Sequence, residues 1–258
     1  MGSRALALES LEQTLSVTTD AKQNHQTPHR HSPDRHDDPL MTTPRFACET
    51  FAQPRGLFHV KSPFPRDVID DIETRIAREG WLSQQQAHRF SPLPAWLVEF
   101  SARLKALALE CGVITDREGG LLDFTQCIVN QYDAGDGLKP HVDLSAFGEL
   151  VVSVSFQSTV AMDFRPVVDD DVDDDDDDVS GVRTSNAHVA VRLDPGDVLF
   201  MRADARLCWT HGIEARRFDE FQTPDGGIER VERRHRVSIT LRTMSGGEDG
   251  HELTVPAD

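Results

Sequence analysis

Two residues with metal-binding chemistry, His141 and Asp143, lie at the end of the stretch 130–143. This stretch begins like a strand and then breaks in a loop that contains two glycines and a proline. Side chains separated by one residue project from the same face of an extended chain, so the imidazole and the carboxylate could hold one side of a metal ion. The spacing alone is weak evidence, because His36 and Asp38 repeat it in a polar tail.

A second histidine further along the chain, His211, extends this pair to a larger set. Two histidines and one carboxylate leave three positions open on an octahedral ion, which is the arrangement used by non-haem Fe(II) oxygenases. The set contains no thiolate ligand, and this argues against a closed structural zinc site. The pattern therefore favours an iron centre that binds further small molecules.

An iron held in this way needs a co-substrate that supplies electrons to dioxygen, and the usual one is 2-oxoglutarate. This molecule is a dicarboxylate, so its far end requires an arginine that can form charge-assisted hydrogen bonds. Arg236 and Arg242 lie six residues apart, and both would point to one face of a strand. Val237, Ile239 and Leu241 would then fill the opposite face.

In their order and spacing, these segments resemble the AlkB family of Fe(II)/2-oxoglutarate dioxygenases. The resemblance covers roughly residues 58–244, and it is closest to the branch that hydroxylates modified wobble uridines in tRNA. The segments that carry it are Asn130-Gln131-Tyr132, Pro140-His141-Val142-Asp143, Ser145-Ala146-Phe147, Val152–Phe156, Met162-Asp163-Phe164, Trp209–Ile213, Arg217-Phe218-Asp219 and Arg236–Arg242.

The resemblance implies Fe(II), 2-oxoglutarate and O2 as cofactor and co-substrates. Among the implied 2-oxoglutarate contacts, Arg236 and Tyr132 would hold the distal carboxylate, and Arg242 and Asn130 would lie near the other carboxylate. No residue is assigned to the substrate. The implied metal ligands, which are also the implied catalytic residues, are His141, Asp143 and His211.

The elements expected around this set are two helices followed by many short strands. Apolar residues at three- and four-residue spacing predict helices at about 65–80 and 94–110, joined by a short polar connector at 83–89. This order predicts a mainly β protein with flanking helices and a jelly-roll barrel, and the resemblance implies the same double-stranded β-helix. The expected strands are 124–132, 150–156, 159–164, 187–193, 198–201 and 236–242.

Composition predicts a disordered polar tail at 1–44, a globular domain at 45–245 and a flexible C-terminus at 246–258. The resemblance implies that the globular domain is an AlkB-like dioxygenase domain. Within the domain, the run 169–178 contains nine aspartates, which repel one another and predict a solvated loop. A cation-binding role for this run is the alternative. Histidines in the tail could bind stray metal, or they could simply belong to a solvated segment.

The formal charge of −17 argues against a general nucleic-acid binder, but the aspartate run accounts for nine of these charges. A second cluster, of arginines, could be a phosphate-binding rim, or its members could form surface pairs with nearby acids. The sequence favours neither interpretation. This arginine cluster consists of Arg206, Arg216, Arg217, Arg230, Arg233 and Arg234.

The site residues predict a dioxygenase, and the resemblance implies that it hydroxylates or oxidatively demethylates nucleic acid, in particular tRNA. Nucleotide-modifying members of the family that the chain resembles carry a lid before the barrel that grips the target base, but here only a short connector precedes the second helix. Strong RNA recognition is therefore expected to need a partner protein or the arginine cluster. The alternatives are the same chemistry on a protein side chain, and a jelly-roll module that only binds. No run of roughly 20 apolar residues predicts a membrane span. Four cysteines without a CxxC pair favour an intracellular protein, cytoplasmic or nuclear.

Overall fold

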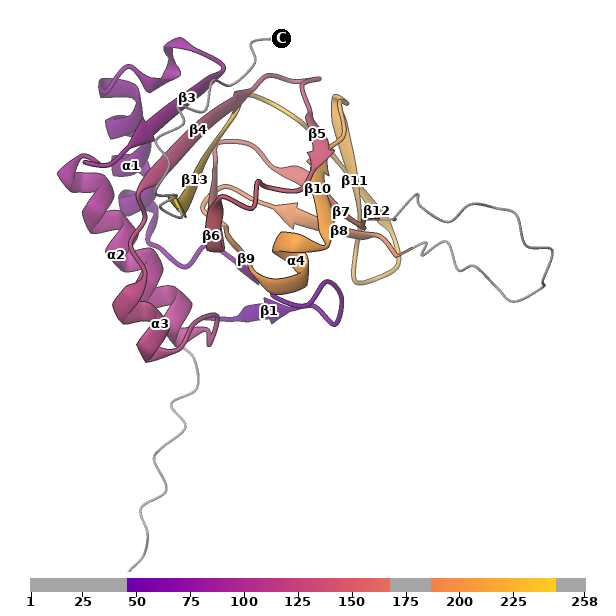
Figure 1. The fold of residues 1–258 in the computed structure, drawn as a ribbon. Coiled ribbons are helices and arrows are strands. Elements are labelled where there is room, and N and C mark those ends of the chain that lie inside the picture. Colours follow the sequence, from indigo (N-terminus) through magenta and orange to yellow (C-terminus); the bar gives the residue numbers. More distant parts are fainter. Residues whose placement is uncertain (1–45, 168–186, 245–258) are drawn as a thin grey trace, which may run out of the picture. The chain divides into compact units, whose positions relative to one another are not determined.

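A computed structural model describes residues 46–167 and 187–244 of the chain (Figure 1). The polar tail at 1–44, the aspartate run at 169–178 and the C-terminus at 246–258 lie outside the described residues. None of the helices that the structure describes is long and apolar enough to cross a membrane.

The larger of two main sheets has seven antiparallel strands in the order β1-β2-β9-β6-β13-β4-β3. β13 lies near the middle of this sheet, where it pairs with β6 on one side and with β4 on the other. In chain order the strands are β1 (Cys48–Thr50), β2 (Leu57–Val60), β3 (Gln86–Phe90), β4 (Gln126–Tyr132), β6 (Phe147–Phe156), β9 (Val198–Met201) and β13 (Arg236–Met244).

The smaller main sheet has four antiparallel strands in the order β5-β10-β7-β8. A separate hairpin, β11 paired with β12, follows it in the chain. In chain order these strands are β5 (Leu138–His141), β7 (Val160–Pro166), β8 (Val189–Leu193), β10 (Trp209–Ile213), β11 (Phe218–Gln222) and β12 (Ile228–Glu232).

Helices cover the outer face of the seven-stranded sheet (Figure 1). In α1 (Arg66–Arg78), the buried residues Ile69, Ile72 and Ile76 recur at three- and four-residue spacing and form one apolar stripe. α2 (Ala95–Glu110) buries a second stripe against the same sheet. The remaining helical segments are the 3-10 turn η1 (Trp81–Ser83), α3 (Asp116–Leu121) and α4 (Ala203–Leu207).

The seven-stranded sheet is apolar on both faces, so it contributes to two cores. On β6, Val152 and Val154 pack toward the helices, whereas Val151 packs among residues of the four-stranded sheet. On β13, Val237, Ile239 and Leu241 belong to the helix-side core, as their alternation in the sequence predicts. The opposite face of β13, which lies between the two sheets, carries polar residues instead.

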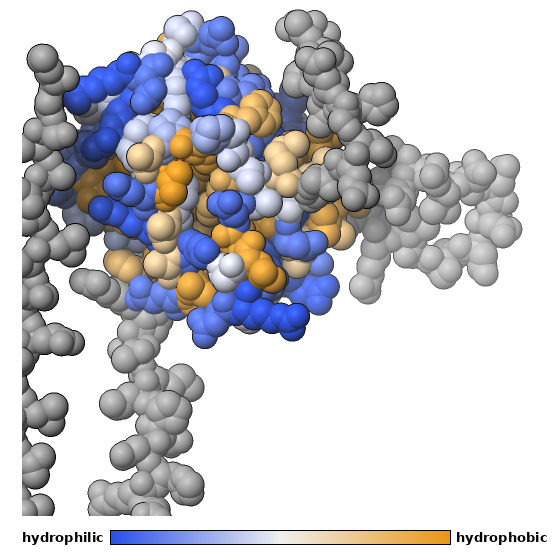
Figure 2. Space-filling model, turned by 60° about the vertical axis from the view of Figure 1, so that its left-hand side comes forward, coloured by the Kyte–Doolittle hydropathy of each residue, from blue (hydrophilic) through white to orange (hydrophobic). Residues whose placement is uncertain are grey.

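Two facing antiparallel sheets with helices on one outer face confirm the predicted jelly-roll class. Strand pairing does not close the sheets into a continuous barrel. Both predicted helices are present. The predicted connector at 83–89 is different, because Gln86–Phe90 pairs with β4 and forms β3, the edge strand of the larger sheet. On the face shown in Figure 2, apolar surface is interspersed with polar residues.

Candidate metal and co-substrate site

A cavity of about 460 Å³ lies between the two sheets and contains the residues singled out by the sequence. The seven-stranded sheet lines it with residues of β3, β4 and β13, and the four-stranded sheet lines it with residues of β5, β7 and β10. All seven predicted site residues line this one cavity, namely Asn130, Tyr132, His141, Asp143, His211, Arg236 and Arg242.

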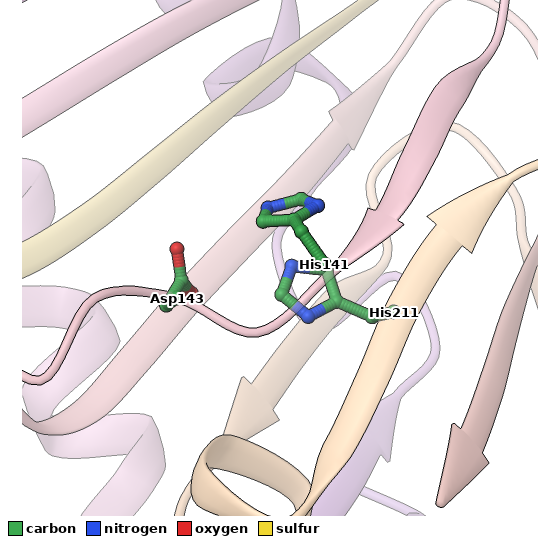
Figure 3. Close-up of side chains that lie close together, drawn as sticks. All are labelled: His141, Asp143 and His211. Atoms are coloured by element: carbon green, nitrogen blue, oxygen red, sulfur yellow. The ribbon is translucent and has the colours of Figure 1, made fainter. Parts of the chain in front are cut away.

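Pairing between β5 and β10 brings the two histidines together, because His141 and His211 are direct partners across the strands. Their ring centroids lie 4.4 Å apart. Asp143 approaches from the loop that follows β5 (Figure 3). Ligand atoms of the three side chains all lie within 4.8 Å of one another, and they form the cluster that could hold a metal ion in the described part of the chain.

Asp143 reaches the histidines in a different way from the one that its spacing suggested. β5 ends at His141, so His141 and Asp143 do not share the face of one strand. Instead the chain leaves the sheet after His141, and the carboxylate of Asp143 is held by Arg242. The carboxylate is nevertheless nearly buried, as a ligand in the interior of the site would be.

The hydrogen bond of His141 and the pKa of His211 both suit metal binding. Nδ1 of His141 lies 2.9 Å from the carbonyl oxygen of Lys139, which can only accept, so Nδ1 carries the proton and Nε2 is free to bind an ion. Burial, followed by the neighbouring His141, lowers the pKa of His211 to about 4. His211 is therefore neutral at pH 7, as a metal ligand must be.

Arg236 is a buried cation that has no carboxylate partner among the described residues. Its side chain is only 3% exposed, and Nη2 donates to Oγ of Ser155 at 2.9 Å. Nε and Nη1 are buried and have no hydrogen-bond partner in the part of the chain that the structure describes. Burial lowers its pKa to about 10, so the guanidinium remains charged at pH 7. Such a group fits an anionic ligand that would complete its hydrogen bonds.

Tyr132 and Asn130 approach this part of the cavity from β4. Arg236 is the direct partner of Tyr132 across the β13–β4 pair, and its guanidinium lies 5.3 Å from the centre of the tyrosine ring. Asn130 accepts a hydrogen bond from Nε2 of Gln86 at 2.6 Å. Gln86 lies on β3 and also lines the cavity, a position that the sequence does not predict because its segment is expected to be a connector.

Half of the arginine cluster makes internal contacts. Arg206 and Arg233 are buried, and Arg233 forms an ion pair with the fully buried Asp219. Arg216 bonds to the same aspartate. The exposed members are Arg217, Arg230 and Arg234. Of the two interpretations that the sequence leaves open, internal pairing therefore fits these three members better than a phosphate-binding rim. Arg216 and Arg233 hold the loop and hairpin after β10, and Arg206 donates to backbone carbonyls of the loop after β5.

Two large apolar side chains that line the cavity are exposed. Phe90 on β3 is 56% exposed, and Leu144 in the loop after Asp143 is 58% exposed. Among the described residues that line the cavity, Asp143 is the one carboxylate, whereas Arg236 and Arg242 are both cationic. The cavity thus offers an apolar surface for a flat group and attracts anions more than cations.

Comparison with known proteins gives a family match over most of the chain. The sequence model described as the 2OG-Fe(II) oxygenase superfamily matches residues 9–242. In *Xenopus tropicalis*, the tRNA (carboxymethyluridine(34)-5-O)-methyltransferase alkbh8 is 31% identical over 136 residues, which are 52% of this chain and 18% of that protein. In *Arabidopsis thaliana*, the alkylated DNA repair protein ALKBH8 homolog is 35% identical over 131 residues, 50% of this chain and 37% of that protein.

These relatives are longer than the matched region, so the chain spans less than two fifths of either of them. Among solved structures, that of OsALKBH1 is similar in fold, with a TM-score of 0.50 and 17% sequence identity. The similarity covers 76% of this chain and 99% of that chain. It supports the jelly-roll assignment made from the sheets.

Proposed function

The chain belongs to the 2OG-Fe(II) oxygenase superfamily, and we propose that it oxidises a base in nucleic acid, with tRNA as the preferred substrate. As a member of this superfamily, it is an Fe(II)- and 2-oxoglutarate-dependent dioxygenase of AlkB-like type that uses O2.

We assign the iron to Nε2 of His141, the carboxylate of Asp143 and the ring of His211. The donor set contains nitrogen and oxygen ligands only, which suits Fe(II). When bound, iron and 2-oxoglutarate would allow O2 to oxidise a substrate C–H bond to an alcohol, with succinate and CO2 as co-products. The protein residues orient these groups and keep water away from them.

Arg236 is assigned to the distal carboxylate of 2-oxoglutarate, beside Tyr132. The observation that carries this assignment is that Nε and Nη1 of Arg236 have no hydrogen-bond partner among the described residues, because such a buried cation needs an anion to complete its hydrogen bonds. Asn130 and Arg242 line the same cavity and are assigned to the side of the other carboxylate. In the structure, Arg242 already bonds to Asp143, so it would serve both groups.

Nucleic acid as the substrate is supported by the relatives and by the cavity. The relatives include proteins named for tRNA modification, for DNA repair and, in *Danio rerio*, as a probable RNA/DNA demethylase. Phe90 and Leu144 provide exposed apolar surface on which a base could stack. Because Asp143 is the one carboxylate in the described lining, the cavity favours an uncharged base over a cationic N-alkylated base.

We infer that a partner protein supplies RNA affinity, because half of the clustered arginines make internal contacts. Phosphate contacts dominate affinity for nucleic acid, and three of the six clustered arginines are engaged in internal hydrogen bonds instead. We therefore expect weak intrinsic binding to tRNA. The net negative charge of the whole chain also weakens binding to the negatively charged RNA backbone.

The proposed function is tested by succinate formation from 2-oxoglutarate with Fe(II) and one candidate substrate at a time. Purified tRNA should stimulate turnover above the rate without substrate, and matched single-stranded DNA should stimulate it less. Stimulation by a peptide pool, with no response to tRNA, would replace the proposal by a protein hydroxylase. The nucleosides of the treated tRNA would then be compared by mass, where a gain of one oxygen or the loss of a methyl group identifies the product.

A further inference from the structure

We propose that Arg206 is a positioning residue that holds the loop carrying Asp143 in the geometry needed to bind the metal. This inference rests on the proposed metal site. Arg206 does not line the cavity and touches none of the three ligand side chains through a hydrogen bond in the described residues. Its action on the site would pass through the backbone of the loop.

Arg206 is buried, with 3% of its surface exposed. Among the described residues, both Nη atoms donate to backbone carbonyls, whereas Nε has no hydrogen-bond partner. Nη1 donates to the carbonyl oxygen of Asp143 at 2.9 Å. Nη2 donates to the carbonyl oxygens of Leu144 at 2.5 Å and Phe147 at 3.1 Å. The fixed fork of one guanidinium thus spans the whole segment from Asp143 to the start of β6.

The loop needs such support because strand pairing ends before it begins. β5 ends at His141 and β6 begins at Phe147, so the backbone of Asp143 has no partner strand. Within the loop, the amide of Phe147 donates to the carbonyl oxygen of Leu144 at 3.1 Å. Without Arg206, the carbonyl of Asp143 would lose its hydrogen bond, and the loop could move away from the histidines.

The position of Arg206 links this loop to the second ligand strand. Arg206 lies on α4, which packs against β6 and leads directly into β10, the strand that carries His211 (Figure 1). The helix is anchored from the other side, where the amide of Ala205 donates to the carbonyl oxygen of Arg55 and Asp204 forms an ion pair with the Arg55 side chain. One short element therefore fixes both parts of the triad relative to each other.

Two other roles for Arg206 predict different results. If only its charge mattered, its removal would tighten metal binding, because a cation near the site repels the metal ion. If its role were purely structural, its removal would lower the melting temperature and leave metal affinity unchanged in the folded protein. Of the three roles, only positioning of the loop predicts that metal binding becomes weaker when the positive charge of Arg206 is removed.

The test is titration of the metal-free full-length protein with Mn(II), followed by electron paramagnetic resonance of the free ion. Arg206→Met should weaken Mn(II) binding by about 10- to 100-fold, the usual effect of removing a group that orients a metal ligand. Arg206→Lys keeps the charge but cannot reach three carbonyls, so it should fall between Arg206→Met and the wild type. Thermal unfolding would confirm that each variant is folded at the temperature of the titration.

Arg202→Met is the matched control. Arg202 immediately precedes α4 and also donates to a backbone carbonyl, that of Val113, but neither residue lines the cavity. This variant should bind Mn(II) like the wild type. Unchanged or tighter binding in Arg206→Met overturns the inference, and Arg206→Lys decides in the same way if Arg206→Met does not fold. A wild type that binds no Mn(II) would instead overturn the proposed metal site, and this inference with it.

Discussion

Arg242 donates a hydrogen bond from Nη1 to Oδ1 of Asp143 at 2.9 Å, across 99 positions of the chain. Both side chains are almost fully buried. The same guanidinium donates from Nε to Gln126 at 2.6 Å and lies over the ring of Phe147. Arg242 belongs to β13, the last strand in the chain. This central strand of the larger sheet therefore holds the carboxylate that faces the two histidines.

Replacing Arg242 by methionine should destabilise the metal-free protein by about 3 kcal/mol, because the buried carboxylate of Asp143 loses its cation. Mn(II) should restore part of this loss by taking over the charge compensation. Urea unfolding with and without Mn(II) measures both effects. An equal loss of stability in the two conditions would show that the metal does not bind next to Asp143.

That the site residues would lie together could be predicted because their types indicate metal and anion binding and their spacing indicates a shared site. His141 and Asp143 stand in a stretch with breakers on one side, and the alternation of Val237, Ile239 and Leu241 predicts that Arg236 and Arg242 share a face. Period-two alternation fixes this face whatever the partners of the strand are.

Contacts with distant parts of the chain could not be predicted in this way. Arg206 reaches Asp143 across 63 positions, and its burial depends on how α4 packs on β6, which no local pattern encodes. β3 was mistaken for a connector because an edge strand with one buried residue, Ala87, shows little apolar periodicity.

His211→Ala should abolish tight Mn(II) binding and 2-oxoglutarate turnover while the fold is retained. His211 supplies one of three ligands, and its imidazole is neutral at pH 7 because burial and His141 lower its pKa to about 4. His188→Ala is the matched control, because His188 pairs with Asp163 and does not line the cavity. Full succinate production by His211→Ala would show that the iron is held elsewhere.

Arg236→Met should separate co-substrate binding from stability. Each charge-assisted hydrogen bond is worth about 1.5–3 kcal/mol, so loss of one or more should weaken 2-oxoglutarate binding at least about tenfold. The melting temperature without co-substrate should stay the same or rise, because a buried cation without an acid partner has been removed. Calorimetric titration of the Mn(II)-loaded protein with 2-oxoglutarate provides the affinity.

Arg236→Lys keeps the positive charge with fewer donors, so its affinity should lie between those of the wild type and Arg236→Met. Iron or manganese binding should survive in both variants, since Arg236 bonds to none of the three ligands in the described residues. An unchanged affinity for 2-oxoglutarate would transfer the role to Arg242.

Phe90→Ala should weaken the binding of single-stranded RNA by about 5- to 150-fold if a base stacks on this ring, since stacking is worth about 1–3 kcal/mol per base. Val98→Ala is the control, because Val98 is 54% exposed but lies on α2 and does not line the cavity. Fluorescence anisotropy with a labelled oligonucleotide compares the two variants. Equal losses in both would place the bound RNA away from the cavity.

A diffraction experiment tests the central claim that one cavity between the sheets holds both the metal and the co-substrate. Crystals would be grown with Mn(II) and a non-reactive 2-oxoglutarate analogue, and anomalous scattering would locate the metal. The proposed site predicts one Mn(II) bonded to His141, Asp143 and His211, with the distal carboxylate of the analogue on Arg236. A metal bound outside this triad, or an analogue that leaves Arg236 without an anionic partner, would contradict it.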